Sequence, residues 1–264
     1  MQGDNFGDWR IAAVSTLLKD LPAAFPRGPA HKAGTPVYLS SLTKDKQHNA
    51  IGFITPSPTA LALNAAIRNA LRAKELRNTL ALTDTLTPLG SGKQVATENL
   101  PHLYDFFEHC MIAVTCSFQS LEMFCNEIIA RKAQSGFNLK RGKDVITVKG
   151  EELERRASTE EKLGSILPSF LGIEGPKGMK LWERFQDLKA ARDSTIHCKS
   201  TETKTDITVD RESLFFQFFR REPIEFPTIA FELIEYFYHD GKLPRWAIAA
   251  KNRIRSAQGG LVID

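Results

Sequence analysis

The stretch from Leu181 to Ser200, LWERFQDLKAARDSTIHCKS, predicts an amphipathic helix that carries an arginine in its apolar stripe. At 100° per residue, one face of this helix carries Leu181, Phe185, Leu188, Arg192 and Ile196, with Trp182 at its edge. A guanidinium keeps its proton, and burying it without a partner is strongly unfavourable. We therefore expect Arg192 to meet a carboxylate, an anion or water.

Three nearby side chains are candidate partners for this arginine or for its chemistry. Asp193 and His197 are four residues apart on one flank of the helix, so a carboxylate–imidazole contact is geometrically easy. Glu122 lies on the shoulder of the apolar stripe of an earlier helix, which makes it the predicted internal partner of Arg192. Either Glu122 only satisfies Arg192 inside the fold, or the pair belongs to a catalytic site.

That earlier helix, from Pro101 to about Ala133, is the longest one the sequence predicts. Its continuous apolar stripe consists of Leu103, Phe107, Cys110, Met111, Val114, Phe118, Leu121, Cys125, Ile128 and Ile129. The remaining faces are only partly polar, so this helix is expected at the centre of a helical bundle.

The rest of the chain predicts a mainly α protein with a small β extension at its N-terminus. We expect an extension over residues 1–58, a helical bundle over 59–240 with its core at about 100–238, and a basic tail over 241–264. The extension is predicted to hold a short helix (Asp8 to Leu21) and a hairpin (Val37–Leu42 with Ala50–Thr55). Further helices are predicted at Thr59–Thr79, Glu151–Leu171, Arg211–Arg221 and Phe226–Tyr238. Loops are predicted at 85–99 and at 131–149, the second with strand character at Val145–Val148, and a short strand is predicted at Thr205–Val209.

Basic residues gather in several segments that could contact a polyanion. Lys140, Arg141 and Lys143 lie near Phe137, a combination that could hold a nucleic-acid backbone and stack a base, although a solvated loop is the alternative. Lys199, just after the helix that carries Arg192, is a further candidate RNA contact.

Two other basic segments have more ordinary explanations. Arg68, Arg72, Lys74 and Arg77 are spread around their helix, which favours a solvated surface. The segment from Pro244 to Arg255 mixes apolar and basic residues, and it could be a capping helix, a partner surface or an ancillary RNA contact.

Composition narrows the class of protein. The chain has 264 residues, 42% of them hydrophobic, which suits a folded core, and a net charge of +4, which permits a polyanionic partner. Its four cysteines form no CxxC pair, so we expect reduced thiols in a cytoplasm, with neither a disulfide nor a zinc site. The N-terminus MQGDNFGDWR is not a signal peptide and no apolar run is long enough for a membrane span, so no membrane partner is expected.

Two segments together resemble the HEPN family. Arg192-Asp193-Ser194-Thr195-Ile196-His197 is similar to that family's pattern of Arg, four to six residues and His, in which Asn, Asp or His commonly follows the Arg. The segment from Phe118 to Ile129, FQSLEMFCNEII, looks like part of an earlier core helix of HEPN relatives. The resemblance covers roughly Leu100 to Tyr238.

This resemblance implies an all-helical fold that pairs as a two-fold homodimer, with the Arg–His pairs of both subunits lining one groove. It implies a metal-independent and cofactor-free endoribonuclease, a toxin or anti-phage effector controlled by an antitoxin or another regulatory protein. His197 would act as acid or base, Arg192 would clamp the phosphate, and Asp193, Glu122 and Asn126 would support them. The products would be a 2′,3′-cyclic phosphate and a free 5′-hydroxyl.

Geometry leaves a second interpretation open. In an unbroken helix, Arg192 and His197 point about 140° apart. They converge only if the helix ends near Thr195 or if another subunit completes the site, and Ser194 and Thr195 favour an early helix end. Otherwise the chain is a non-catalytic HEPN-like module that binds RNA or a nucleotide or mediates dimerisation. A third interpretation is a protein that binds a polypeptide partner through its aromatic C-terminal helices.

Overall fold

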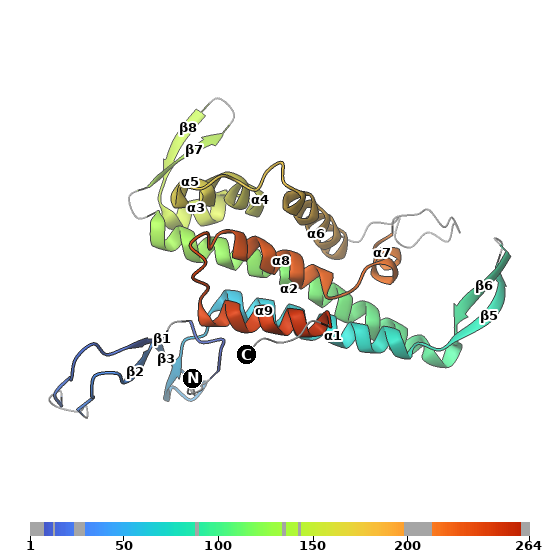
Figure 1. The fold of residues 1–264 in the computed structure, drawn as a ribbon, viewed down its shortest axis with the longest axis horizontal. Helices are drawn as coiled ribbons and strands as arrows, with labels where there is room; N and C mark the ends of the chain where they lie inside the picture. The colour runs from blue at the N-terminus through green and yellow to red at the C-terminus, as the bar shows by residue number, and fades with distance from the viewer. Residues whose placement is uncertain are drawn as a thin grey trace.

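Two long helices form the centre of the protein. The computed structural model describes residues 8–12, 14–23, 30–87, 90–133, 136–141, 144–197 and 213–259. In it, α1 (Pro58–Thr79) packs along α2 (Leu100–Lys132) (Figure 1). Alanines buried along α1 let the two backbones approach closely, because small side chains at a contact shorten the interaxial distance.

Three more helices complete the helical body. They are α6 (Lys180–Ile196), α8 (Glu225–Tyr236) and α9 (Arg245–Ala257), and α8 lies between α6 and α9 (Figure 1). The short α7 (Leu214–Arg220) adds Phe218 to a core whose largest fully buried apolar side chains include Phe106, Phe124, Phe185 and Phe226. The predicted mainly α fold is therefore confirmed, and the C-terminal segment is a helix that covers α1 and α8.

The predicted single helix from Glu151 to Leu171 is wrong. The chain instead forms α3 (Gly150–Arg156), α4 (Thr159–Glu161), a π-helical turn η2 (Lys162–Ile166) and α5 (Leu167–Leu171). Ser158 explains the restart, because its hydroxyl accepts the Glu161 N–H while the Glu161 carboxylate accepts the Ser158 N–H. Gly172 ends α5 with φ of 66°, a left-handed conformation that favours glycine.

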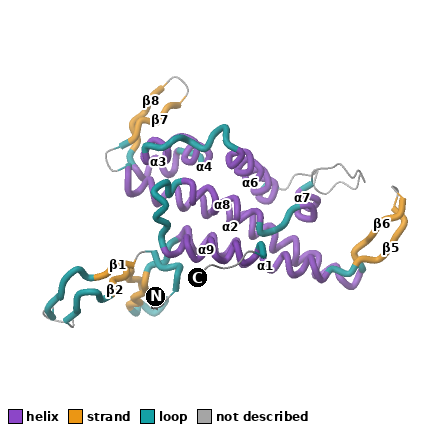
Figure 2. The backbone as a smooth tube through the Cα atoms, in the orientation of Figure 1, coloured by secondary structure: helices purple, strands orange, loops and turns teal. Residues whose placement is uncertain are grey.

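Small antiparallel hairpins project from the helical body (Figure 2). The predicted N-terminal hairpin is confirmed as β3 (Ser40–Lys44) and β4 (Ala50–Ile54), with Ser41 opposite Phe53. The loop predicted at 85–99 is instead part of a hairpin of β5 (Leu82–Thr87) and β6 (Gly90–Val95). In the loop predicted at 131–149, β7 (Phe137–Arg141) pairs with β8 (Asp144–Val148), which confirms the strand character predicted at Val145–Val148. A 3₁₀ turn, η1 (Thr97–Asn99), joins β6 to α2.

The predicted helix from Asp8 to Leu21 is wrong. In the described part of this segment, β1 (Val14–Thr16) pairs with β2 (Pro36–Tyr38). The Ala12 N–H donates to the Thr55 carbonyl at 2.9 Å, so backbone bonds reach distant strands in place of the preceding turn. Leu21, on the side of this helix that was expected to be apolar, is 40% exposed, and Leu18 is 97% exposed, so neither leucine holds a helix against the bundle.

Two further predictions concern a strand after α6 and the absence of a membrane span. The strand predicted at Thr205–Val209 lies outside the described residues. None of the helices within the described ranges combines the length and the apolar character that a bilayer crossing requires.

Candidate functional site

Arg192 lies on an aromatic face at the contact between α6 and α2. Phe185 and Leu188 are fully buried and anchor α6, and Phe185 stacks on Phe118 of α2 with ring centroids 6.1 Å apart. The Arg192 Cζ atom lies 4.3 Å from the centroid of the same Phe118 ring. The arginine in the apolar stripe is therefore accommodated by a cation–π contact, and its side chain keeps 28% of its surface exposed.

Arg192 pairs with the carboxylate of Asp193 and not with that of Glu122, which was the predicted partner. Arg192 Nη1 donates to Asp193 Oδ1 at 2.7 Å. Glu122 is half-buried, and none of the hydrogen bonds or ion pairs among the described residues joins it to Arg192. The adjacent carboxylate reaches the guanidinium while Phe118 occupies the side toward α2, so the predicted inter-helix pair is replaced by a local one.

His197 ends α6. Its backbone N–H donates to the Asp193 carbonyl at 2.9 Å, and its φ of −114° and ψ of 60° leave the helical region. Thr195 Oγ1 donates to the Ala191 carbonyl at 2.8 Å in the last turn. The helix therefore extends to Ile196, one residue past the end predicted near Thr195, and the His197 side chain is exposed to solvent.

The structure brings together only part of the predicted catalytic group within one chain. Arg192 and Asp193 form a direct pair, whereas no hydrogen bond or ion pair among the described residues joins the His197 imidazole to either of them. The predicted Asp193–His197 contact is a backbone bond only. Arg192 and His197 therefore lie at the same end of α6 without a direct contact.

Asn126 serves a buried lysine that the sequence did not single out. Lys162 is 1% exposed, and its Nζ donates to Asn126 Oδ1 at 2.9 Å and to the Glu154 carbonyl at 2.7 Å. Asn126 lies eight residues after Phe118, about 12 Å along α2, so it does not reach Arg192. The sequence pattern did not indicate that Lys162 is buried, because Lys162 lies in a π-helical turn that the pattern did not predict.

Glu127, the neighbour of Asn126, supports the start of α1. Its Oε1 atom accepts the Thr59 hydroxyl at 3.0 Å, and Ser57 Oγ accepts the Ala60 N–H at 3.1 Å. A carboxylate there also complements the positive end of the helix dipole. The segment from Phe118 to Ile129 of α2 thus contacts α6, η2 and α1.

The buried thiol of Cys125 lies in the same region as Lys162. Burial raises the pKa of Cys125 strongly, with the nearby Lys162 ammonium opposing the rise and Glu122 adding to it. Burial likewise raises the pKa of Cys110 to about 12. Both thiols are therefore protonated and unreactive at neutral pH.

The predicted RNA-binding basic residues are only partly described. Lys140 and Arg141 lie on β7, with backbones opposite Val145 and Asp144, and their side chains lie outside the described part. Lys143 and Lys199 lie outside the described residues altogether. The aromatic candidate beside them, Phe137, packs edge-on against Phe170 at 5.0 Å between ring centroids.

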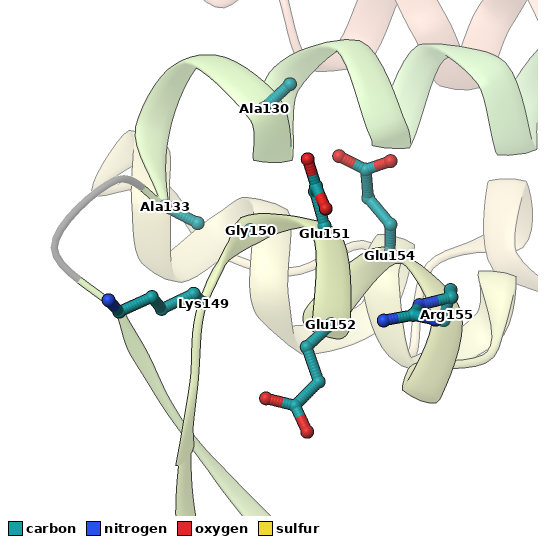
Figure 3. A pocket seen from close by; sticks show the side chains of 8 residues that line it. All are labelled: Ala130, Ala133, Lys149, Gly150, Glu151, Glu152, Glu154 and Arg155. Atoms are coloured by element: carbon teal, nitrogen blue, oxygen red, sulfur yellow. The ribbon is translucent and has the colours of Figure 1, made fainter.

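A pocket of about 530 Å³ lies between the C-terminal end of α2 and the start of α3. Figure 3 shows the carboxylates of Glu151 and Glu154 pointing toward α2 at this pocket. Neither Arg192 nor His197 lines this pocket, so it is separate from the predicted site. Within the described ranges, no cluster of three or more His, Cys, Asp or Glu side chains could hold a metal ion.

Comparisons of the chain with family models, with curated proteins and with solved structures find no match.

Proposed function

We propose that the protein is a metal-independent endoribonuclease of the HEPN type, which cleaves RNA by attack of the 2′-hydroxyl. The observation that carries the proposal is the partly exposed Arg192 guanidinium on Phe118, near the helix end where His197 is exposed. A permanently charged guanidinium with free surface beside an exposed imidazole is a suitable pair for phosphodiester chemistry. Its biological role would be that of a toxin or anti-phage effector held by an antitoxin or another regulatory protein.

The chemistry follows from the two side chains. A neutral imidazole can take the proton from a 2′-hydroxyl, and an imidazolium can give one to the leaving 5′-oxygen. The Arg192 guanidinium would stabilise the negative charge that accumulates on the phosphate. Asp193 holds that guanidinium at 2.7 Å, so phosphate binding would share or displace this ion pair.

A homodimer would complete this site. Within one chain His197 makes no direct contact with Arg192, so the proposed groove needs the Arg192 and His197 of two copies around the same phosphate. RNA is the proposed substrate because its 2′-hydroxyl supplies the nucleophile.

Cleavage of RNA in the presence of a chelator tests the proposal. The purified protein should convert single-stranded RNA to products with a 2′,3′-cyclic phosphate and a 5′-hydroxyl, and His197→Ala should reduce the rate at least about 100-fold. His102→Ala, which removes another exposed imidazole from α2, serves as the matched control and should cleave like the parent. Equal activity of His197→Ala and the parent would reject the assignment.

A second candidate is a non-catalytic HEPN-like module that binds RNA or a nucleotide or mediates dimerisation. The observation that favours it is the Arg192–Asp193 ion pair, which occupies the guanidinium without involving His197. In that case the parent would bind RNA without cleaving it, and His197→Ala would bind with unchanged affinity.

A further inference from the structure

Two basic segments far apart in the sequence lie side by side in the fold. Helix α9 runs along α1 (Figure 1), and side-chain bonds join them at two places. The Lys74 ammonium donates to the Ala257 carbonyl at 3.0 Å, and the Arg253 guanidinium donates to Asn64 Oδ1. The surface formed by these helices, called the α1–α9 surface below, therefore combines charges that the sequence separates.

The α1–α9 surface has an excess of positive charge. Its basic side chains are Arg68, Arg72, Lys74, Arg77, Arg245, Lys251, Arg253 and Arg255, and Glu75 is the one acidic residue within α1 and α9. Ion pairs join Arg72 to Glu75, Arg77 to Glu222 and Lys251 to Glu235, and Arg245 lies near Asp8.

Four cations on this surface have no carboxylate partner among the described residues: Arg68, Lys74, Arg253 and Arg255. The eight basic side chains and Glu75 give α1 and α9 together a net charge of +7, against +4 for the whole chain, so the remainder of the sequence is net negative. A folded chain that concentrates its whole charge excess on two adjacent helices presents a directed electrostatic field to a polyanion.

Part of this charge is held in place rather than free in solvent. Asn64 fixes the Arg253 guanidinium, which also lies 5.8 Å from the centroid of the half-buried Trp9 ring. Lys74 is held by the carbonyl at the end of α9. Arg68 and Arg255 are exposed on the same two helices. Cations of fixed geometry next to an aromatic ring are typical of single-stranded nucleic-acid sites.

We propose that the α1–α9 surface binds the sugar–phosphate backbone of a single-stranded nucleic acid. An anionic membrane is the less suitable partner, because Trp246 and Ile254 of α9 are buried in the core, which leaves Ile248, 49% exposed, as the one large apolar side chain of this helix that could insert into lipid. Helices α2 and α8 separate α9 from α6 (Figure 1), so this surface is distinct from the Arg192 site and does not depend on its activity.

Fluorescence anisotropy with a labelled 2′-O-methyl oligouridine of about 12 nucleotides tests the proposal. The 2′-O-methyl group removes the nucleophile of the proposed cleavage reaction, so binding is measured whether or not the protein is a nuclease. The variant Arg68→Gln/Arg255→Gln removes two exposed guanidinium groups without breaking a described contact. We expect its Kd to rise roughly ten-fold near physiological salt, and the slope of log Kd against log[KCl] to fall by about 1.4.

The matched control is Lys132→Gln/Arg155→Gln, which removes two exposed charges that lie outside α1 and α9, near the C-terminal ends of α2 and α3. It changes the net charge equally and should keep the affinity and the salt slope of the parent. If both double variants weaken binding to the same extent, or if neither does, the proposed surface is wrong. Binding to phosphatidylserine vesicles without binding to the oligonucleotide would overturn it in favour of a membrane partner. Equal thermal unfolding midpoints confirm that each variant is folded.

Discussion

Lys162 carries an ammonium group at a position where the side chain is 1% exposed, and its two described acceptors are uncharged. A buried charge is tolerated when hydrogen-bond acceptors replace the lost water, and it becomes costly when one of them is removed. The stability of the region around η2 therefore depends on a polar contact that is separate from the apolar core.

Replacing Asn126 by Leu should lower the free energy of unfolding by about 2 kcal/mol, because the Lys162 ammonium then loses one of its two acceptors. Replacing Lys162 by Met as well should recover about half of that loss, since an apolar pair needs no acceptor. Urea unfolding of both single variants and the double variant measures this coupling. Lys189→Met, at a lysine that pairs with Glu160 at the surface, should change stability by less than about 0.5 kcal/mol. Strictly additive effects at residues 126 and 162 would contradict the contact.

The cysteines should differ in reactivity according to their burial. With a pKa raised to about 12 by burial, Cys110 has a thiolate fraction of roughly 10⁻⁴ at pH 8, and the pKa of buried Cys125 is also strongly raised. Iodoacetamide should therefore label neither residue in the native protein, and both should react in urea. The half-buried Cys116, whose pKa burial also raises, should react at an intermediate rate. Peptide mapping by mass spectrometry reads each site separately, and rapid native labelling of Cys125 would contradict its burial.

The sequence predicted features of single residues that depend on their own helix, but it did not predict their contacts with other helices. The end of α6 was predicted near Thr195 from local chemistry, and the helix extends one residue further, to Ile196. The partner of Arg192 depended on which ring of α2 lies beneath it, and helical periodicity does not specify contacts between helices. The role of Asn126 depended on a π-helical turn that lies 36 residues further along the chain.

At the scale of elements, the start of α1 depends on a cap made from two parts of the chain. Ser57 accepts the Ala60 N–H at 3.1 Å, and Glu127 of α2 accepts the Thr59 hydroxyl at 3.0 Å. The same residues join the first long helix to the second at the point where the chain leaves the N-terminal strands. Loss of this cap would leave buried helix donors without acceptors.

Replacing Ser57 by Ala should lower the free energy of unfolding by about 1 kcal/mol, because an N-cap acceptor is lost. Ser57→Asn should restore most of it, since an asparagine side chain accepts the same backbone N–H. Thermal and urea unfolding measure both changes. Equal stability of Ser57→Ala and the parent would show that the cap contributes nothing.

Elements with a strong helical period were predicted almost to the residue, and those without it were not. Helices α1 and α2 have long apolar stripes that only a helix presents on one face, and both predictions are confirmed. The segment at 82–95 has no apolar face, and its threonines and glycines indicated a loop. Cross-strand pairing, such as Asp84 opposite Lys93, makes it a hairpin, and such pairing is visible only once the chain is folded.

The whole molecule consists of a helical body with projecting hairpins (Figure 1). Leu42 on β3 is 76% exposed and Leu86 on β5 is 87% exposed, so these hairpins bury little surface against the body. Two-stranded hairpins without a packed face are marginally stable, and they open more easily than the helices.

Limited trypsin digestion should therefore cut the hairpins before the helical body. We expect the first cleavages after Lys44, Lys46 and Lys93, which are exposed on or beside hairpin strands. Arg68 and Arg72 are equally exposed but lie within α1, whose backbone must unfold before cleavage. Mass spectrometry of early time points identifies the sites. Initial cleavage after Arg68 would show that α1 opens as easily as the hairpins.

At this scale the sequence predicted the helical class but not the arrangement of charge. Each basic segment alone was compatible with a solvated surface. The sequence shows the charges within one segment, but it does not show which segments lie side by side in the fold. The packing of α9 on α1 placed Arg68 and Arg253 on one surface, although they are separated by most of the chain.

The bond between Lys162 and Asn126 also fixes how the chain is aligned with itself. Aliphatic side chains that pack between two helices tolerate a slide of one helical turn, because each ridge then enters the next groove. Here a slide of one turn toward the C-terminal end of α2 would move the ammonium from the Asn126 amide oxygen to the methyl group of Ala130, which is unfavourable. Lys162 thereby opposes a shift of η2 in that direction along α2.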